Sequence, residues 1–243
     1  DLRRSRGLGD VYKRQIESLE NTIESFHYSE SLGCEFIETD VQVSSDGIPY
    51  IFHDETLTRL LNRDDVFSSL HSNEIDNLKI FDEHSIPKLE TVLRMFPDMK
   101  FQIDVKTDEV AMPALAVIQE NNAMDRVCIA SFNSKRLNLV NNNYPDICIS
   151  MGPYEVAKML LSSFGLYKKS ILGNCLQIPI YEYGIKLVTK RFVKFIHSKG
   201  LKVCVWTIND EKTFKYLIDI GVDGIITDKP KLLFEVLDSA TNQ

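Results

Sequence analysis

The sequence has no excess of positive charge and no long hydrophobic run. Its 28 Lys and Arg residues are outnumbered by 35 Asp and Glu residues, which gives a net charge of −7. A chain of that charge is a poor partner for nucleic acid or for an anionic membrane surface. No apolar run approaches the length of about 18 residues that a membrane helix needs. We therefore expect no nucleic-acid partner and no membrane segment.

Cysteine is also scarce. The five cysteines, Cys34, Cys128, Cys148, Cys175 and Cys204, form no close pairs in the sequence and have no metal-ligand spacing. Several lie within β-branched runs, which predicts small buried hydrophobic side chains in a reducing compartment. This pattern favours a cytoplasmic location.

Nothing in the sequence divides the chain into parts, since it contains no linker, no break in composition and no repeat. Short apolar segments instead alternate with amphipathic ones over most of the 243 residues. Alternating strands and helices indicate parallel βαβ units, and about 250 residues is typical of one barrel. We therefore predict an α/β fold, a TIM (β/α)8-type barrel. The expected strands are 36–43, 101–106, 127–132, 146–150, 175–179, 201–208 and 224–228, with 48–53 as an extra ribbon beside the first.

The N-terminal stretch fits this pattern poorly. Residues 1–15 contain five Lys or Arg residues, show no apolar periodicity and include no initiating Met. We expect them to be a non-native or disordered leader, followed by a single barrel domain over residues 16–243. The first barrel strand would then be missing or replaced. A signal peptide could have been lost with it, so localisation stays open.

One predicted strand carries two acidic residues on the same face. In Phe36–Val43, Glu38 and Asp40 point to one side while Ile37 and Val41 point to the other. Two neighbouring carboxylates repel each other and are costly to bury unless a cation compensates them. Carboxylate oxygens are the preferred ligands of hard divalent ions, so this strand predicts a metal site. The alternative is an edge strand with a solvated acidic face.

Other polar residues lie where predicted strands end. They are His53, Asp104, Lys106, Gln177 and Trp206. Barrel enzymes have their active sites at the carboxyl ends of the strands, so these side chains are expected to meet there. An imidazole near a carboxylate pair can act as a general acid or base.

Several motifs occur in an order that is similar to one known family. The chain resembles the glycerophosphodiester phosphodiesterase family from about Ile16 to Pro230. The matching motifs are Glu20-Asn21-Thr22, Glu38-Thr39-Asp40-Val41, Asp46-Gly47, His53-Asp54, Ile86-Pro87-Lys88-Leu89-Glu90, Asp104-Val105-Lys106, Val205-Trp206-Thr207-Ile208-Asn209 and the segment from Gly221 to Pro230.

The resemblance implies metal-dependent hydrolysis of a glycerophosphodiester, a small-molecule substrate, to glycerol 3-phosphate and an alcohol. Glu38, Asp40 and Asp104 are expected to bind a divalent ion, Ca²⁺ or Mg²⁺, although Glu is more common in the family at position 104. Lys106 adds a second positive charge, and His53 transfers a proton. In the family, a glycerol hydroxyl attacks phosphorus and water then opens the cyclic phosphate.

Three further residues are expected to bind substrate: Glu20, Gln177 and Trp206. Two of them also have a structural interpretation. Glu20 could be a helix-start carboxylate that the helix dipole favours. Trp206 could pack on the glycerol or headgroup, or it could cap the barrel. The sequence does not indicate an oligomeric state or a headgroup preference.

One departure from the family concerns its first catalytic histidine. The family has His-Arg-Gly at the end of its first strand, about ten residues before Glu-Asn-Thr. The corresponding window here contains Val11-Tyr12-Lys13, and Ser5-Arg6-Gly7 lies too far upstream. An alternative function is therefore a catalytically impaired barrel that binds a phosphodiester or a metal. Phospholipase D-type cleavage of lysolipids is a related activity, but no lipid-facing apolar segment is evident in the sequence.

Overall fold

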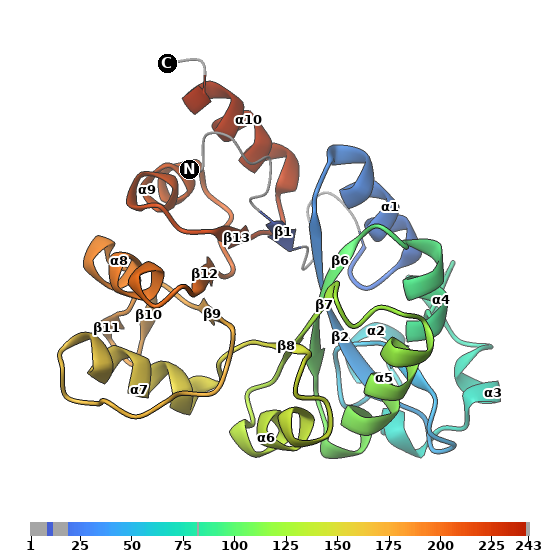
Figure 1. The fold of residues 1–243 in the computed structure, drawn as a ribbon. Coiled ribbons are helices and arrows are strands. Elements are labelled where there is room, and N and C mark those ends of the chain that lie inside the picture. Colours follow the sequence, from blue (N-terminus) through green and yellow to red (C-terminus); the bar gives the residue numbers. More distant parts are fainter. Residues whose placement is uncertain (1–8, 12–18, 82, 242–243) are drawn as a thin grey trace.

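The computed structural model describes residues 9–11, 19–81 and 83–241. Its elements follow the predicted alternation of strands and helices (Figure 1). The strands are β1 (Gly9–Val11), β2 (Phe36–Val43), β3 (Pro49–Ile51), β4 (Lys79–Ile80), β5 (His84–Ser85), β6 (Lys100–Val105), β7 (Val127–Ala130), β8 (Cys148–Ile149), β9 (Cys175–Ile178), β10 (Tyr181–Glu182), β11 (Ile185–Lys186), β12 (Lys202–Val205) and β13 (Gly224–Ile226). The helices are α1 (Ile23–Leu32), α2 (Thr58–Leu61), the 3-10 helix η1 (Phe67–Ser69), α3 (Ser72–Ile75), α4 (Leu89–Met95), α5 (Asp108–Glu120), α6 (Ser134–Asn143), α7 (Pro153–Ser163), α8 (Lys190–Ser198), α9 (Glu211–Ile220) and α10 (Pro230–Thr241).

The barrel strands form two sheets. Strands β3-β2-β6-β7-β8 make one sheet and β1-β13-β12-β9 the other, with all pairs parallel except β2 and β3. A parallel bridge between Ser150 and Cys175 joins β8 to β9. The predicted ribbon beside the first acidic strand is confirmed, because Val41 on β2 pairs antiparallel with Ile51 on β3. The fold is of the TIM-barrel type that the alternation predicts.

The position of a first strand is occupied by part of the stretch that was expected to be a leader. Gly9–Val11 pairs with β13 in parallel, with Gly9 opposite Gly224 and Val11 opposite Ile226. The same three residues lie beside β2 (Figure 1). The strand at Gly224 therefore has a parallel neighbour, and Gly9–Val11 lies where the first barrel strand was expected to be missing or replaced. The remainder of residues 1–15 lies outside the described residues.

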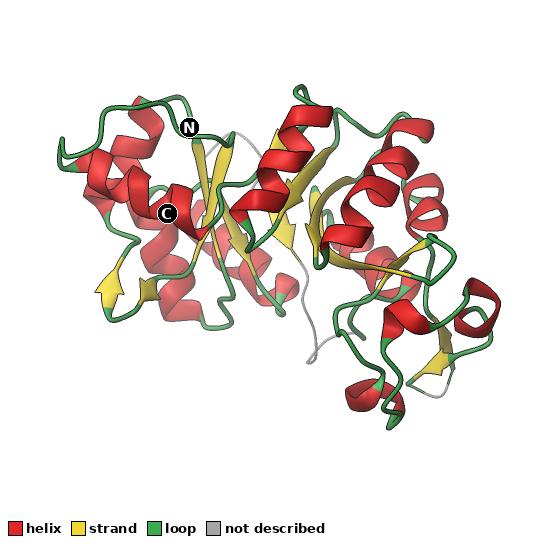
Figure 2. Cartoon of the chain, turned by 90° about the horizontal axis from the view of Figure 1, so that it is seen from below, coloured by secondary structure: helices red, strands yellow, loops and turns green. Residues whose placement is uncertain are grey.

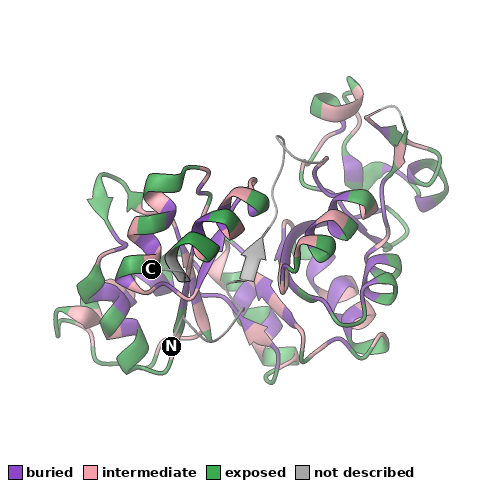
Figure 3. Cartoon of the chain, turned by 90° about the horizontal axis from the view of Figure 1, so that it is seen from above, coloured by how far each residue is buried: buried purple, intermediate pink, exposed green. Residues whose placement is uncertain are grey.

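Hydrophobic residues between the strands and the outer helices form the core. One cluster, with Phe26, Ile103 and Ile129 among its members, lies between β2, β6 and β7 and the helices that cover them. A second cluster around Leu176, Val203 and Phe214 lies under α8, α9 and α10. Figure 2 shows the strands inside and the helices outside, and Figure 3 shows buried residues where the two layers meet. No helix in the described part of the chain has the length and apolar character to span a bilayer.

The polar stretch 56–85 carries a small core of its own. The rings of Phe52 and Phe67 stack with centroids 4.7 Å apart, and Tyr50 packs edge-on against Phe67. The Tyr50 hydroxyl donates a hydrogen bond to Asp76 Oδ1 at 2.8 Å. These contacts hold η1 and the end of α3 against β3, next to the loop that carries His53.

Helix α1 illustrates how local sequence positions the site. Thr22 caps the helix, because its hydroxyl accepts a hydrogen bond from the Ser25 amide at 3.1 Å, and Gly33 ends it in a left-handed conformation with φ 87°. The preceding Asn21 has φ 55°, a conformation that Asn tolerates better than most residues. Glu20 and Asn21 are consequently fixed next to the barrel.

Two local features, a hairpin after β9 and the start of helix α5, were not expected from the sequence. A short hairpin, β10–β11, follows β9, where no strand was predicted, and its turn contains Tyr183 at φ 47° and Gly184 at φ 78°. Helix α5 begins at Asp108, because the Thr107 hydroxyl caps it by accepting a hydrogen bond from the Val110 amide. Pro113 then lies in the second turn of the helix.

The cysteines also differ from expectation. Cys34 is buried as predicted, whereas the other four are partly exposed. The sulfur atoms of Cys128, Cys148 and Cys175 lie within 4.8 Å of one another, so cysteines that are distant in sequence do form a close group. Hydrogen bonding from Cys128 and Cys175 lowers the pKa of Cys148 to about 4. Burial raises the pKa of Cys204 to about 12.

Candidate active site

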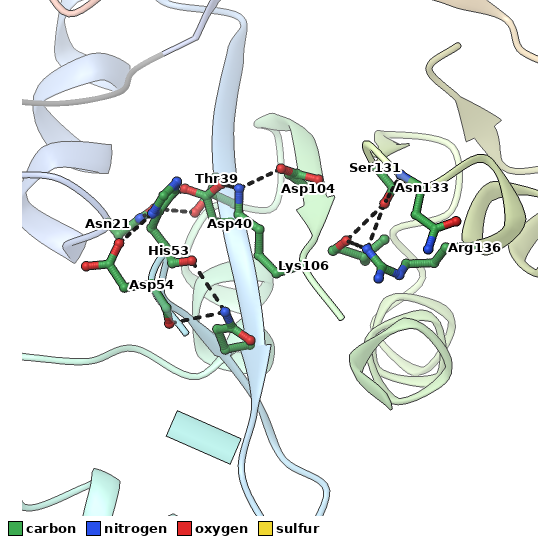
Figure 4. A network of polar contacts seen from close by, with 12 residues as sticks. Asn21, Thr39, Asp40, His53, Asp54, Asp104, Lys106, Ser131, Asn133 and Arg136 are labelled. Atoms are coloured by element: carbon green, nitrogen blue, oxygen red, sulfur yellow. Dashed lines mark hydrogen bonds and ion pairs between the residues drawn. The ribbon is translucent and has the colours of Figure 1, made fainter. Parts of the chain in front are cut away.

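Two acidic residues on neighbouring strands hold one lysine between them. Asp40 on β2 is in register with Asp104 on β6. The Lys106 ammonium contacts Asp40 Oδ1 at 2.7 Å and Asp104 Oδ2 at 2.6 Å (Figure 4). The Asp40 side chain is fully buried and that of Asp104 is 7% exposed. The ammonium therefore balances two carboxylates that would otherwise repel each other at the carboxyl end of the barrel.

An amide completes the surroundings of Asp40. Asn21 Nδ2 donates to Asp40 Oδ2 at 3.3 Å, and Thr39 Oγ1 donates to Asn21 Oδ1 at 2.7 Å. Since the Thr39 hydroxyl fixes the orientation of the amide, Asn21 presents its donor to the carboxylate. Asn21 lies in the Glu-Asn-Thr motif, but no role of its own was predicted for it. Its contact with Asp40 depends on the loop before α1.

His53 lies at the end of a chain of ion pairs. Its Nδ1 is 2.6 Å from Asp54 Oδ1. Arg59 Nε contacts Asp54 Oδ2 at 2.6 Å, and Arg59 Nη1 contacts Glu20 Oε1 at 2.5 Å. The carboxylate at position 54 can only accept, so His53 donates through Nδ1 and directs Nε2 elsewhere. Figure 4 shows His53 beside Asp40.

Backbone contacts hold the same loop against β2. Gln42 Nε2 donates to the carbonyl oxygens of His53 and Asp54, at 3.4 and 3.1 Å. The Phe52 amide donates to the Asp40 carbonyl at 3.0 Å. Gln42 shares its strand face with Asp40, so the residue that positions His53 is on the strand that carries the acidic pair.

The charged groups in this series of ion pairs stabilise one another. Burial raises the pKa of the Asp54 carboxyl, but Arg59 and His53 more than offset this effect, so that its pKa lies below the ordinary value. Burial likewise opposes the charge of Arg59, and Asp54 and Glu20 more than compensate, which raises its pKa. Asp54 and Arg59 therefore remain an ion pair across the neutral range. Glu20 contacts Arg59 rather than standing alone at the helix start.

The three residues expected to bind a metal offer carboxylate oxygens to a hard divalent ion. Glu38 is 5% exposed, on the same strand face as Asp40, and it pairs in register with Gln102. Among the described residues, Glu38, Asp40 and Asp104 are not gathered within 4.8 Å of one another, whereas Asp40 and Asp104 both contact Lys106. The set offers only carboxylate oxygens in a buried position, so its chemistry fits Ca²⁺ or Mg²⁺.

Gln177 and Trp206 lie in different surroundings. Gln177 Nε2 donates to Gln102 Oε1 across the barrel interior, so its amide is engaged by another strand. Trp206 follows β12 and packs edge-to-face with Phe132, with ring centroids 6.1 Å apart. Phe132 follows β7 and is 68% exposed. The pair lies at the carboxyl ends of two strands, and Phe132 was not among the predicted site residues.

Two further polar groups at strand ends were not predicted in detail. Arg136 Nη1 donates to the Val105 carbonyl at 2.7 Å and to Ser131 Oγ at 2.9 Å, a group that Figure 4 shows apart from Asp40 and His53. Asn209 Nδ2 donates to Asp228 Oδ2 at 2.7 Å. Both sets of hydrogen bonds join a loop to the end of a strand, at the rim of the barrel.

A pocket of about 500 Å³ adjoins the acidic strands. It is lined by Gln42, Val43, Ser44, Ser45, Gly47, Glu55, Ser68, Thr107, Glu109 and Pro113. Gln42 lies two residues after Asp40 on the same face, and Thr107 directly follows Lys106. The pocket therefore lies at the carboxyl end of β2 and β6, where a small ligand can reach both strands.

Comparison with known proteins agrees with the motifs. The sequence model of the Glycerophosphoryl diester phosphodiesterase family matches residues 6–232, a range that reaches into the expected leader. Probable glycerophosphodiester phosphodiesterase 2 of Mycobacterium tuberculosis is 31% identical over 226 residues, which cover 89% of this chain and 84% of that protein. The human protein Lysophospholipase D GDPD1 is 22% identical, over 91% of this chain and 82% of its own length.

Solved structures agree on the fold. An Oleispira antarctica phosphodiesterase, solved in complex with the product sn-glycerol-3-phosphate, aligns with a TM-score of 0.78 and 22% identity over 95% of this chain and 96% of that chain. A glycerophosphodiester phosphodiesterase from Agrobacterium tumefaciens aligns with a TM-score of 0.77 and 22% identity over 95% of this chain and 99% of that chain. The chain thus belongs to the glycerophosphodiester phosphodiesterase family of phosphoric diester hydrolases.

Proposed function

We propose that this chain hydrolyses water-soluble glycerophosphodiesters to glycerol 3-phosphate and an alcohol. The observation that carries the proposal is the placement of Lys106 between Asp40 and Asp104, beside a histidine whose Nδ1 is held by Asp54. A phosphodiester needs positive charge at its non-bridging oxygens and a group that moves a proton, and this arrangement offers both.

His53 is the proton-transfer residue of this proposal. With Nδ1 donating to Asp54, Nε2 is the nitrogen that exchanges a proton with the substrate or with water. Asp54 stabilises the imidazolium that forms when Nε2 accepts, and Arg59 keeps Asp54 ionised by pairing with it at 2.6 Å. Proton transfer of this kind typically contributes about 10²- to 10⁴-fold to a rate.

Lys106 and the three carboxylates handle the charge of the phosphate. Lys106 turns from its two aspartates toward a non-bridging oxygen, where developing negative charge strengthens the contact. When bound by Glu38, Asp40 and Asp104, a divalent cation supplies Lewis-acid neutralisation of the diester. Asn21 keeps Asp40 oriented through its contact at 3.3 Å. The pocket beside Gln42 and Thr107 offers room for the alcohol portion of the substrate.

The test is a coupled glycerol 3-phosphate assay with glycerophosphocholine as substrate. We expect wild-type turnover to depend on Ca²⁺ or Mg²⁺ and to fall at least about 100-fold in His53→Ala. His27→Ala is the matched control, because His27 is exposed and contacts Glu30 on its own helix. Activity that survives both chelation and His53→Ala would contradict the proposal. Complete inactivity of a folded wild-type chain that still binds the diester would favour the impaired binding barrel.

A second candidate, cleavage of lysolipids, gains support from the β10–β11 hairpin. Tyr181, Tyr183 and Ile185 are 59%, 96% and 56% exposed, and the hairpin follows the carboxyl end of β9. This is the apolar segment that the sequence did not reveal. If it contacts an acyl chain, Tyr183→Ser with Ile185→Ser will reduce turnover of lysophosphatidylcholine and leave that of glycerophosphocholine unchanged. Equal effects on both substrates would remove the lysolipid candidate.

A further inference from the structure

The barrel interior contains thiols where branched aliphatic side chains are usual. On β7, Val127 and Ile129 are buried against the helices, so Cys128 between them faces the interior. By the same alternation, Cys148 precedes buried Ile149 on β8, and Cys175 precedes buried Leu176 on β9. Three adjacent strands therefore direct a cysteine to the same side.

Strand register brings these cysteines together. Cys128 pairs with Cys148 across β7 and β8, and Cys175 is bridged to Ser150, two residues after Cys148. The sulfur atoms of Cys128 and Cys175 are 3.7 Å apart, and all three sulfurs lie within 4.8 Å of one another. Cys148 and Cys175 are partly exposed and the Cys128 thiol lies buried behind them, so an ion from solvent reaches the group from the side of Cys148 and Cys175.

We propose that Cys128, Cys148 and Cys175 form a thiolate site for a Zn²⁺ ion inside the barrel. Zn–S bonds of about 2.3 Å place tetrahedral sulfur ligands about 3.8 Å apart, close to the observed 3.7 Å separation. Binding forms three Zn–S bonds and releases the remaining thiol protons to solvent, with no change of oxidation state. A water molecule fills the fourth position of the tetrahedron.

The ligand chemistry selects the ion. Thiolates favour soft ions such as Zn²⁺ and Cu⁺ over Ca²⁺ and Mg²⁺. Three thiolates with Zn²⁺ leave a net charge of −1, whereas Cu⁺ leaves −2, which costs more in a partly buried place. The carboxylates of the proposed active site suit hard ions instead, so the two sites differ in selectivity.

The thiol site is separate from the proposed phosphodiester site along the strands. Gln102 is in register with Cys128 and lies two residues before Asp104, while Gln177 lies two residues after Cys175. The contact between Gln177 and Gln102 therefore crosses the barrel on the carboxyl side of Cys175. A Zn²⁺ ion held here ties three strands together without using a residue that contacts the substrate.

The test uses the reduced wild-type chain, freed of metal, with Co²⁺ as the spectroscopic probe and Zn²⁺ as the competitor. We expect one equivalent of Co²⁺ to produce a thiolate-to-cobalt charge-transfer band that Zn²⁺ abolishes. Cys128→Ser, Cys148→Ser and Cys175→Ser should each weaken binding by more than the roughly 10- to 100-fold typical of losing an outer-shell partner. Cys34→Ser, which changes a cysteine outside the group, should bind as wild type does.

Two further measurements test the zinc site even if the serine variants do not fold or the phosphodiesterase function is absent. Should the serine variants fail to fold, Zn²⁺ must still raise the melting temperature of the wild type and protect three cysteines from alkylation, as counted by mass spectrometry. Asp40→Asn should retain the charge-transfer band, so loss of the phosphodiesterase function leaves this result intact. A reduced wild-type chain without the band, or one isolated with a Cys128–Cys175 disulfide that takes up no Zn²⁺, would overturn the proposal.

Discussion

The most informative perturbation of this molecule is Lys106→Met. The substitution keeps most of the apolar stem and removes the ammonium that contacts Asp40 at 2.7 Å and Asp104 at 2.6 Å. Both aspartate side chains are at most 7% exposed, so water cannot replace the lost charge easily. Two buried carboxylates then lie in register on adjacent strands with their cation removed.

The expected loss of stability follows from the burial of the two aspartates. Removing one partner of a buried ion pair costs about 3–5 kcal/mol. A chain of this length loses about 2–4 °C of melting temperature per kcal/mol, so the loss should be roughly 6–20 °C. Lys100→Met is the matched control on the same strand. Lys100 is 48% exposed and lies 4.0 Å from Glu35, so its substitution should cost less than about 1 kcal/mol.

The assay is thermal unfolding by circular dichroism, first with chelator and then with Ca²⁺ or Mg²⁺ at rising concentration. A divalent ion can restore the missing positive charge between the carboxylates, so it should raise the melting temperature of Lys106→Met more than that of the wild type. Activity should not return, because Lys106 is also needed at the phosphate. If Lys106→Met melted like Lys100→Met, or if cations stabilised both proteins equally, the account of this charge cluster would be refuted.

Three smaller predictions concern the orientation of His53, the stability of the protein at low pH and the backbone conformation of two glycines. Asp54→Asn should lower kcat about 10²- to 10⁴-fold with little change in KM, because an amide no longer fixes the tautomer of His53. Folding lowers the pKa of Asp54, so the ionised carboxylate contributes fully to stability above its ordinary pKa of 3.8. That contribution is lost as the pH falls through the pKa of the folded state. In urea unfolding, the difference in unfolding free energy between wild type and Asp54→Asn should therefore shrink below about pH 4. Gly173→Ala should destabilise by more than about 2 kcal/mol in the same unfolding assay, because φ is 125° and a Cβ would lie 2.5 Å from Met151 Cγ. Gly165→Ala, with φ 76° and open space around it, should cost about 1 kcal/mol, and equal costs at the two glycines would contradict the steric argument.

Most of the barrel could be predicted because its signals are local. The helix over Ile23–Leu32 follows from apolar periodicity and from Gly33, and β2 follows from strict alternation. Strand and helix alternation then fixes parallel pairing, which places the ends of β2 and β6 together. For that reason Asp40, Asp104 and Lys106 could be expected at one place from the sequence.

The parts that could not be predicted depend on contacts between distant segments. Arg59 lies in a polar stretch without clear periodicity, and its contact with Glu20 joins segments that are distant in the sequence. The cysteine group requires the register of three strands, which spacing in the sequence does not reveal.

A first-strand histidine can be tested directly in this barrel, and the test separates the two function classes that the sequence left open. The sequence has no histidine before His27, while His53 already has its orienting partner at 2.6 Å. Replacing residues 1–15 by a strand that ends in His-Arg-Gly about ten residues before Glu20 would add the second proton-transfer group at the place where β1 lies beside β2. Turnover of glycerophosphocholine should then rise by about 10²- to 10⁴-fold and vanish again in His53→Ala. The control replacement ends in Ala-Arg-Gly, so that strand repair is distinguished from catalysis. If both replacements fold and neither is more active than the original chain, a missing proton-transfer group is not what limits the reaction, and the binding barrel becomes the better description.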